Sequence, residues 1–301
     1  MPEQTGSHSN LQIDCSRCLP IRYDESSCRR CIEICPHNAI TITEQLLIAP
    51  ERCRGCLLCS TVCPSGALEM NHDFAACRAA LARVGNPVLG CCRTAENANA
   101  TLPCLGGLSE EHLLALQLNL NGTLTLLINS CSGCPNNAML PLLLERIQLI
   151  SKGGMDQEGC RIVTADAGTN VSLQHEQLDR RSFFSSFRTA LFQGAAAVMN
   201  SATEPVEQAC SYGDKRLPKR RELLNQTISQ LSADQQERIS RPFTHQITFS
   251  SDCSACQGCV AICPTGALTT TDRAQHPAFK QDHCTGCGLC VEFCLDQAIS
   301  L

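Results

Sequence analysis

The middle of the chain alternates between apolar runs and polar breaks at spacings typical of an α/β fold. Residues 87–90, 123–128 and 161–164 are short apolar runs that predict buried strands. A leucine-rich run follows Ser109, a favoured helix N-cap, and a second apolar helix is expected from about 138 to 149. This order of elements predicts a small β-α-β-α-β unit.

The segment from about residue 174 to 240 is more polar and is predicted to be helical. Between Arg180 and Phe192, four phenylalanines form a helical stripe beside arginines. This stripe predicts a helix face that packs against the ferredoxin-like modules. The alternative is a face that docks on a partner subunit or on a membrane surface. A second basic cluster opens a later helix, and it is either solvated surface or a landing site for an acidic redox partner. Its members are Lys215, Arg216, Lys219, Arg220 and Arg221.

Composition changes this picture, because 25 of the 301 residues are cysteine and none is tryptophan. Disulfide scaffolds are typically short and secreted, whereas the first twenty residues here show no secretory signal. We therefore expect a cytoplasmic protein with reduced thiols that are free to bind metal. Apolar runs fall short of the roughly 20 residues of a spanning helix, so no transmembrane segment is predicted. The net charge of -5 predicts no nucleic-acid partner.

The cysteines repeat one spacing, C-x2-C-x2-C-x3-C, near both ends of the chain. After the last cysteine of each copy, a turn is expected to lead into a short strand. A proline follows that cysteine in the first two copies, and Leu295 replaces it in the third. The three copies are Cys53, Cys56, Cys59 and Cys63, then Cys253, Cys256, Cys259 and Cys263, and then Cys284, Cys287, Cys290 and Cys294.

A fourth copy near the N-terminus is stretched by an insertion. It consists of Cys15-x2-Cys18, twelve further residues, and Cys31-x3-Cys35 before a proline. Cys28 is one cysteine too many, since Cys28-x2-Cys31-x3-Cys35 also resembles the end of an unstretched copy. We take Cys28 as the spare, because using it would leave Glu25 where a first cysteine is required.

The compact spacing suits cubane iron–sulfur clusters. Three thiolates on a tight loop can face three corners of one cube, while the fourth cysteine points to another cube, so clusters occur in pairs. Zinc is the alternative, but zinc sites usually combine two cysteine pairs separated by about 12 to 20 residues. The three regular copies do not have that arrangement.

Residues from about 10 to 70 and from about 245 to 301 each resemble a bacterial-type two-cluster ferredoxin. The stretched copy resembles the insertions of iron–sulfur subunits of molybdenum oxidoreductases and hydrogenases. The resemblance implies four [4Fe–4S] clusters with four cysteines each. Cluster one has Cys15, Cys18, Cys31 and Cys63, and cluster two has Cys35, Cys53, Cys56 and Cys59. Cluster three has Cys253, Cys256, Cys259 and Cys294, and cluster four has Cys263, Cys284, Cys287 and Cys290.

Five more cysteines lie at the ends of predicted strands or before a helix in the middle region, where α/β folds bring chemistry together. They are Cys91, Cys92, Cys104, Cys131 and Cys134. Their order resembles the delta subunit of methyl-viologen-reducing hydrogenases, which implies a [2Fe–2S] cluster. Buried or redox-active thiols are the equal alternative.

We therefore expect an α+β protein with two ferredoxin-like modules, at residues 10–72 and 245–301. They flank a small α/β domain at 84–172 and a helical segment at 173–241. The predicted function is electron transfer through four [4Fe–4S] clusters, as a subunit beside a redox enzyme such as a hydrogenase or formate dehydrogenase. The alternative is a reductase of a disulfide or sulfur compound, with its site at the five middle cysteines.

Overall fold

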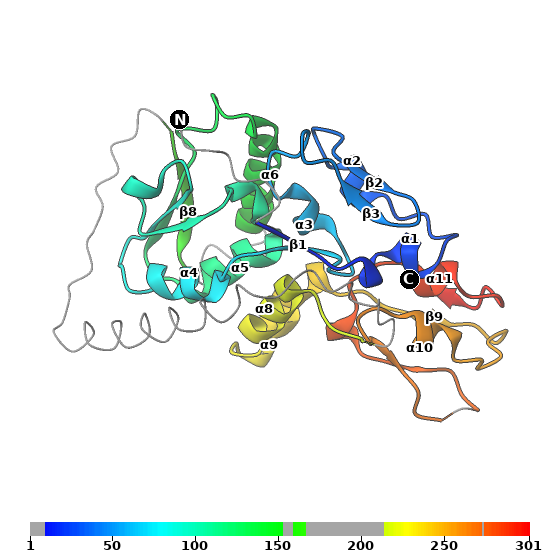
Figure 1. Cartoon of the computed structure of the whole chain (residues 1–301). Coiled ribbons are helices and arrows are strands. Elements are labelled where there is room, and N and C mark those ends of the chain that lie inside the picture. Colours follow the sequence, from blue (N-terminus) through cyan, green and yellow to red (C-terminus); the bar gives the residue numbers. More distant parts are fainter. Residues whose placement is uncertain (1–9, 153–158, 167–213, 273) are drawn as a thin grey trace, which may run out of the picture.

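The fold is given by a computed structural model, which describes residues 10–152, 159–166, 214–272 and 274–301. Helices and strands are mixed, and cysteine-rich modules stand at both ends of the chain. Figure 1 shows these two modules on one side of the molecule and a parallel sheet on the other. The predicted stripe from Arg180 to Phe192 and the single cysteine Cys210 lie outside the described residues.

The N-terminal module is built from two antiparallel strand pairs and short helices. Strand β1 pairs with β4 and strand β2 pairs with β3, so the first and last strands of the module lie side by side. The strands are β1 (Leu11–Ile13), β2 (Ile40–Ile42), β3 (Leu46–Ile48) and β4 (Leu68–Met70). The helices are η1 (Cys15–Arg17), α1 (Leu19–Arg22), α2 (Arg30–Glu33) and α3 (Leu58–Val62).

The C-terminal module repeats this arrangement. Its first strand pairs with its last, and its two inner strands pair with each other. The strands are β9 (Thr248–Phe249), β10 (Leu268–Thr269), β11 (Ala278–Phe279) and β12 (Ile299–Ser300). The helices are α10 (Gly258–Ile262), η7 (Gln281–His283) and α11 (Leu289–Glu292). In both modules a short strand follows the last cysteine of each copy, as the sequence predicts.

The middle region is a parallel four-stranded sheet in the order β6-β5-β7-β8. The three predicted strands are present as β5 (Val88–Cys91), β7 (Thr123–Leu127) and β8 (Arg161–Ala165). Strand β6 (Ala100–Leu102) was not predicted, because only one of its three residues is buried and it forms no apolar run. Short helical turns occupy η2 (Ala95–Asn97), η3 (Leu105–Gly107) and η4 (Asn137–Met139).

Helices α4 (Phe74–Leu81), α5 (Glu110–Asn119) and α6 (Leu140–Lys152) accompany the sheet. Helix α5 begins where Ser109 predicts, because the Ser109 hydroxyl accepts a hydrogen bond from the backbone N–H of His112 at 3.4 Å. The His112 ring nitrogen Nδ1 lies 2.8 Å from the same hydroxyl. This capping box holds the start of α5 in place.

One hydrophobic core runs through the N-terminal module and the sheet region, whereas the C-terminal module has a small core of its own. Helices α8 (Lys219–Ile228) and α9 (Ala233–Ser240), followed by η6 (Arg241–Phe243), lie between the sheet region and the C-terminal module (Figure 1). None of the described helices is long and apolar enough to span a bilayer.

Candidate functional site

The cysteine loops share an unusual backbone conformation. In the regular copy that starts at Cys53, Gly55 and Leu57 have φ values of 67° and 64°, in the left-handed region. The equivalent residues are Ala255 and Gln257 in the second copy, and Gly286 and Gly288 in the third, all with positive φ. Left-handed residues other than glycine are uncommon, and they concentrate at functional sites. The three regular copies therefore share a pair of left-handed residues at the same two places between their cysteines.

In the N-terminal module, one small cavity is lined by Cys35, Cys53, Cys56 and Cys59, the set predicted for cluster two. We call it the second thiol site. Burial raises the pKa of Cys59 well above its ordinary value, and the neighbouring thiols Cys56, Cys31, Cys53 and Cys35 raise it further. These thiols therefore lie near Cys59, in or beside the same cavity.

A second cavity in the same module is lined by Cys18, Cys28, Cys31 and Cys63, and we call it the first thiol site. Burial raises the pKa of Cys18 to about 12, and the Cys63, Cys31 and Cys28 thiols add to the increase. The structure thus places Cys28, taken as the spare, in this site. Cys15 does not line it, and the Cys15 sulfur lies 4.0 Å from the carbonyl oxygen of Leu46 instead.

Backbone hydrogen bonds align Cys18 with the first cysteines of two regular copies. The N–H of Ala49, four residues before Cys53, donates to the carbonyl of Ala39 at 2.8 Å, in the turn that precedes β2. The N–H of Lys280, four residues before Cys284, donates to Ala267 in the same way at 2.7 Å. In the stretched copy the corresponding donor is Asp14, whose N–H bonds to Ala67 at 2.8 Å.

Four residues after Asp14 comes Cys18, not Cys15. Cys18 also follows the 3-10 turn η1 as Cys284 follows η7. In this alignment the insertion lies between Cys18 and Cys28, and Cys28-x2-Cys31-x3-Cys35 has the spacing of the end of a regular copy. That spacing was visible in the sequence, but only the strand pairing identifies the partner cysteine upstream.

The C-terminal module carries equivalent sites. Cys263, Cys284, Cys287 and Cys290 line one cavity, the fourth thiol site, with the set predicted for cluster four. Among the four cysteines predicted for cluster three, Cys253 and Cys256 lie close enough to Cys259 to raise its pKa, after burial. Cys294 accepts a hydrogen bond from the Ala298 N–H at 3.4 Å. We call Cys253, Cys256, Cys259 and Cys294 the third thiol site.

The sulfur atoms have polar neighbours that suit cluster ligands. The Ala39 N–H donates to the Cys35 sulfur at 3.4 Å, as Ala298 does to Cys294 in the other module. The Cys63 sulfur lies 3.7 Å from the Ser65 hydroxyl, and the Cys263 sulfur lies 3.6 Å from the Thr265 hydroxyl. Hydrogen bonds to sulfur stabilise the negative charge that thiolate ligands and a cluster carry. The donor set and its surroundings therefore fit [4Fe–4S] clusters.

The five cysteines of the middle region lie near one another in the structure. Burial raises the pKa of Cys104 to about 12, and Cys56, Cys91 and Cys134 contribute to the increase. Burial and the thiols Cys91 and Cys134 raise the pKa of Cys131 to about 11. Cys91, Cys104 and Cys131 are buried, whereas Cys92 is exposed. The group therefore reaches the solvent at Cys92.

This cysteine group lies directly beside the second thiol site. The Asn136 side-chain amide donates to the carbonyl of Arg54 at 3.0 Å, next to Cys53, and lies 4.0 Å from the Cys104 sulfur. A Cβ atom on Gly106 would come within 2.4 Å of the Cys56 carbonyl oxygen. The two backbones thus meet without any side chain between them at this point.

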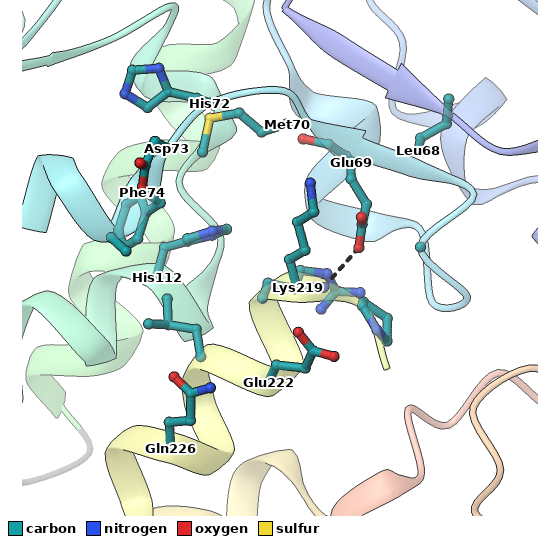
Figure 2. Close-up of a pocket in the computed structure, with 16 residues that line it drawn as sticks. Leu68, Glu69, Met70, His72, Asp73, Phe74, His112, Lys219, Glu222 and Gln226 are labelled. Carbon is teal, nitrogen blue, oxygen red and sulfur yellow. Dashed lines mark hydrogen bonds between the residues drawn. The ribbon is translucent and has the colours of Figure 1, made fainter. Parts of the chain in front are cut away.

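The remaining single cysteines of the described residues are buried packing residues. Cys77 lies on α4, and Cys160 precedes β8 with its sulfur 3.6 Å from the Leu116 carbonyl. A separate cavity of about 380 Å³ lies between β4, α4, α5 and α8, lined by polar residues such as Glu69, Lys219 and Glu222 (Figure 2). No cysteine lines that cavity. Among the described residues, the grouped thiols lie in the two modules and at the ends of the sheet strands.

Comparison with known families agrees with this geometry. Residues 26–67 match a 4Fe–4S dicluster domain, and residues 247–295 match another model described as a 4Fe–4S dicluster domain. The chain carries two dicluster ferredoxin domains. The first match includes Cys28 but neither Cys15 nor Cys18.

A pyruvate synthase subunit, PorD, of Thermotoga maritima is similar to part of this chain. The two are 34% identical over 64 residues, which are 21% of this chain and 60% of PorD. The chain therefore spans less than two thirds of the length of this relative. No solved structure matches the chain. The two dicluster domains identify an iron–sulfur protein with an electron-transfer role.

Proposed function

We propose that this protein relays electrons through four [4Fe–4S] clusters as a subunit of a larger redox complex. The observation that carries the proposal is that three separate cavities are each lined by four cysteine thiols. Each cavity combines cysteines from both copies of its module, which is the arrangement that clusters in two-cluster ferredoxins require. When bound, each cluster accepts and releases single electrons.

The proposed ligand sets follow the four thiol sites. Clusters two, three and four keep the sets expected from the sequence. Cluster one takes Cys18, Cys28, Cys31 and Cys63, so that Cys28 replaces Cys15. The hydrogen bond from Asp14 to Ala67 supports this choice, because it aligns Cys18 with Cys53 and Cys284, the first cysteines of two regular copies.

The proposed partners are the catalytic subunits of an oxidoreductase. The similarity to a pyruvate synthase subunit supports that class of partner. A hydrogenase or a formate dehydrogenase, as named from the sequence, remains a prediction, and so does the cytoplasmic location. We retain the domain boundaries 10–72, 84–172, 173–241 and 245–301 as part of the proposal.

Anaerobic purification from the native host, with iron and acid-labile sulfide counted per chain, tests the function. We expect about sixteen irons and sulfides, in a brown protein that co-purifies with catalytic subunits. A count near eight would show that only one module binds clusters. A colourless protein with zinc and no sulfide would overturn the proposal.

A second candidate function is favoured by the gathering of five cysteines beside the second thiol site. We propose that Cys91, Cys92, Cys104, Cys131 and Cys134 form a further redox centre, either a [2Fe–2S] cluster or a thiol site that reduces a disulfide or sulfur compound. The neighbourhood of Cys104 and Cys56 supports electron exchange with cluster two.

The double variant Cys131→Ser/Cys134→Ser distinguishes a [2Fe–2S] cluster from a thiol site. A [2Fe–2S] centre predicts that the iron count falls from about eighteen to about sixteen. A thiol site predicts an unchanged count of about sixteen with loss of disulfide-reducing turnover. If neither iron content nor turnover changes, the middle cysteines are packing residues and this second function is wrong.

A further inference from the structure

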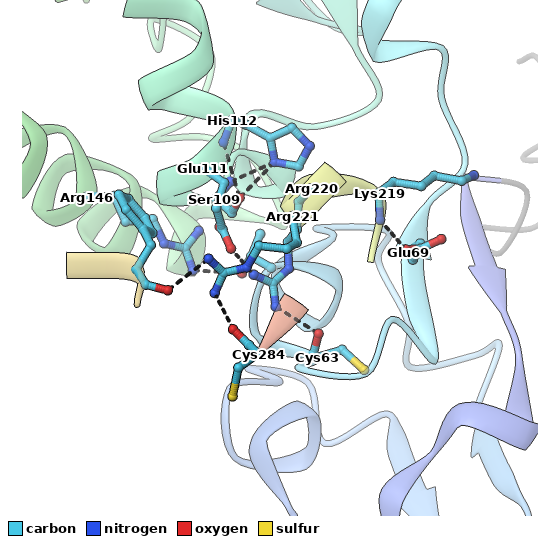
Figure 3. A network of polar contacts seen from close by, with 12 residues as sticks. Cys63, Glu69, Ser109, Glu111, His112, Arg146, Lys219, Arg220, Arg221 and Cys284 are labelled. Carbon is cyan, nitrogen blue, oxygen red and sulfur yellow. Dashed lines mark hydrogen bonds and ion pairs between the residues drawn. The ribbon is translucent and has the colours of Figure 1, made fainter. Parts of the chain in front are cut away.

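The basic cluster at the start of α8 is exposed at Lys215, Arg216 and Lys219, whereas Arg220 is half-buried and Arg221 is buried. The Arg221 side chain is only 5% exposed. Its guanidinium donates to the carbonyl of Cys284 at 3.1 Å, and Arg220 donates to the carbonyl of Cys63 at 2.9 Å (Figure 3). Two adjacent arginines thus reach the fourth and the first thiol sites, which belong to different modules.

Other contacts cross the same junction. Arg30, next to Cys31, donates to the carbonyl of Gly286 at 3.1 Å. The backbone N–H of Ser27, next to Cys28, donates to the carboxylate of Glu292 at 3.2 Å. The rings of Tyr23 and Phe293 meet edge to face with centroids 5.3 Å apart. The loops that carry the first and fourth thiol sites therefore face each other across the module boundary.

The two arginines are held by groups outside the cysteine loops. Arg220 forms a buried ion pair with Glu111 of α5. The other end of the Arg221 guanidinium donates to the Phe243 carbonyl at 2.8 Å. Burial lowers the pKa of Arg221 from a high starting value, and Glu111 offsets part of the decrease. An arginine stays charged in proteins, so both positive charges persist beside the thiol sites.

Fixed positive charges beside a cluster favour its reduced form, because reduction adds one negative charge. We propose that electrons cross between the two modules from cluster one to cluster four, or in reverse, at this junction. Arg220 and Arg221 are the positioning residues that hold the loops of the first and fourth thiol sites next to each other, and their charges would raise the reduction potentials of clusters bound there. In the step, one electron leaves the reduced cluster and enters the oxidised one, and no bond forms or breaks.

This inference rests on the proposed function, and its route would order the centres as two, one, four and three. The test uses full-length protein purified anaerobically, with Arg220→Gln and Arg221→Gln as variants. Arg52→Gln is the matched control, because Arg52 also adjoins a ligand cysteine but pairs with Glu51 on the surface. Redox titration followed by electron paramagnetic resonance gives the potential of each cluster and the magnetic coupling between reduced clusters.

We expect both variants to keep about sixteen irons and to lower the ratio of reduced to oxidised cluster about tenfold at a fixed potential. For one electron this ratio corresponds to about 59 mV. Arg220→Gln should act on cluster one and Arg221→Gln on cluster four, with weaker coupling between the two. The Arg52→Gln variant should leave these two clusters unchanged.

Two outcomes would overturn the inference: unchanged potentials and coupling in iron-replete variants, or equal shifts in the Arg52→Gln control. If Arg221→Gln loses iron, Arg221→Lys replaces it, because lysine keeps the positive charge. In Arg221→Lys the reduction potential of cluster four is expected to stay close to the wild-type value. A decrease as large as that expected for Arg221→Gln would contradict a role of the charge. A wild-type protein without about sixteen irons would instead refute the proposed function itself.

Discussion

Replacing Cys28 by alanine is expected to remove cluster one. The Cys28 thiol lines the first thiol site together with Cys18, Cys31 and Cys63. Alanine supplies neither sulfur nor oxygen as a ligand, so the cube would be left with three cysteines. One cluster of four should then be lost or degraded, and the iron count should fall from about sixteen to as few as twelve.

Cys15→Ala is the matched control, since it makes the same chemical change in the same N-terminal module. The Cys15 sulfur has one weak polar contact, at 4.0 Å from the Leu46 carbonyl, and the side chain is only partly buried. We expect a full complement of iron and a loss of stability of about 1 kcal/mol or less.

The assay is iron and sulfide analysis of both variants after anaerobic purification, with electron paramagnetic resonance after dithionite reduction. The spectrum of Cys28→Ala should lack the signal of one cluster, and that of Cys15→Ala should match the wild type. If Cys15→Ala loses about four irons while Cys28→Ala keeps about sixteen, the alignment of Cys18 with Cys53 and Cys284 is wrong.

Three further predictions concern stability, measured by anaerobic thermal unfolding. Burial lowers the pKa of His112 from 6.5 to about 4, so between these pH values the unfolded state binds a proton that the folded state does not. The free energy of unfolding should therefore fall by about 2 kcal/mol from pH 7 to pH 5. His112→Gln keeps a capping residue, and an equal fall in that variant would show that His112 is not the group responsible. Gly66 and Gly266 both have a φ of 71°, but only on Gly66 would a Cβ atom meet the Glu69 carboxylate at 2.9 Å. Gly66→Ala should therefore cost about 1 kcal/mol more than Gly266→Ala, and equal costs would show that backbone strain alone decides. Arg146→Met leaves the carbonyl of Leu108 without its buried donor, so the free energy of unfolding should fall by about 2 kcal/mol. A fall of less than about 0.5 kcal/mol would show that water replaces the guanidinium as the donor.

The local sequence pattern was sufficient to predict a feature wherever one short segment contains all the residues that produce it. The spacing from Cys53 to Cys63 and from Cys284 to Cys294 indicated cluster loops, because three ligands on one tight turn depend only on neighbouring backbone. The same holds for α5, whose start is set by the Ser109 cap, and for the apolar strand β7. Strand β6 was not predicted, because a strand at the edge of the sheet is only partly buried and its sequence contains no apolar run.

The sequence by itself determined that this protein carries paired thiol sites at both ends and a parallel sheet between them, because those features follow from residue spacing and apolar periodicity. Only the tertiary structure places Cys28, and not Cys15, in one cavity with Cys18 and Cys63, since this cavity forms when segments that are far apart in the chain pack together. The tertiary structure also showed that Arg220 and Arg221 donate hydrogen bonds to backbone carbonyls of both modules and are not solvated charges. Their acceptors, Cys63 and Cys284, come from separate modules, and no local pattern encodes contacts that form only when distant segments pack together.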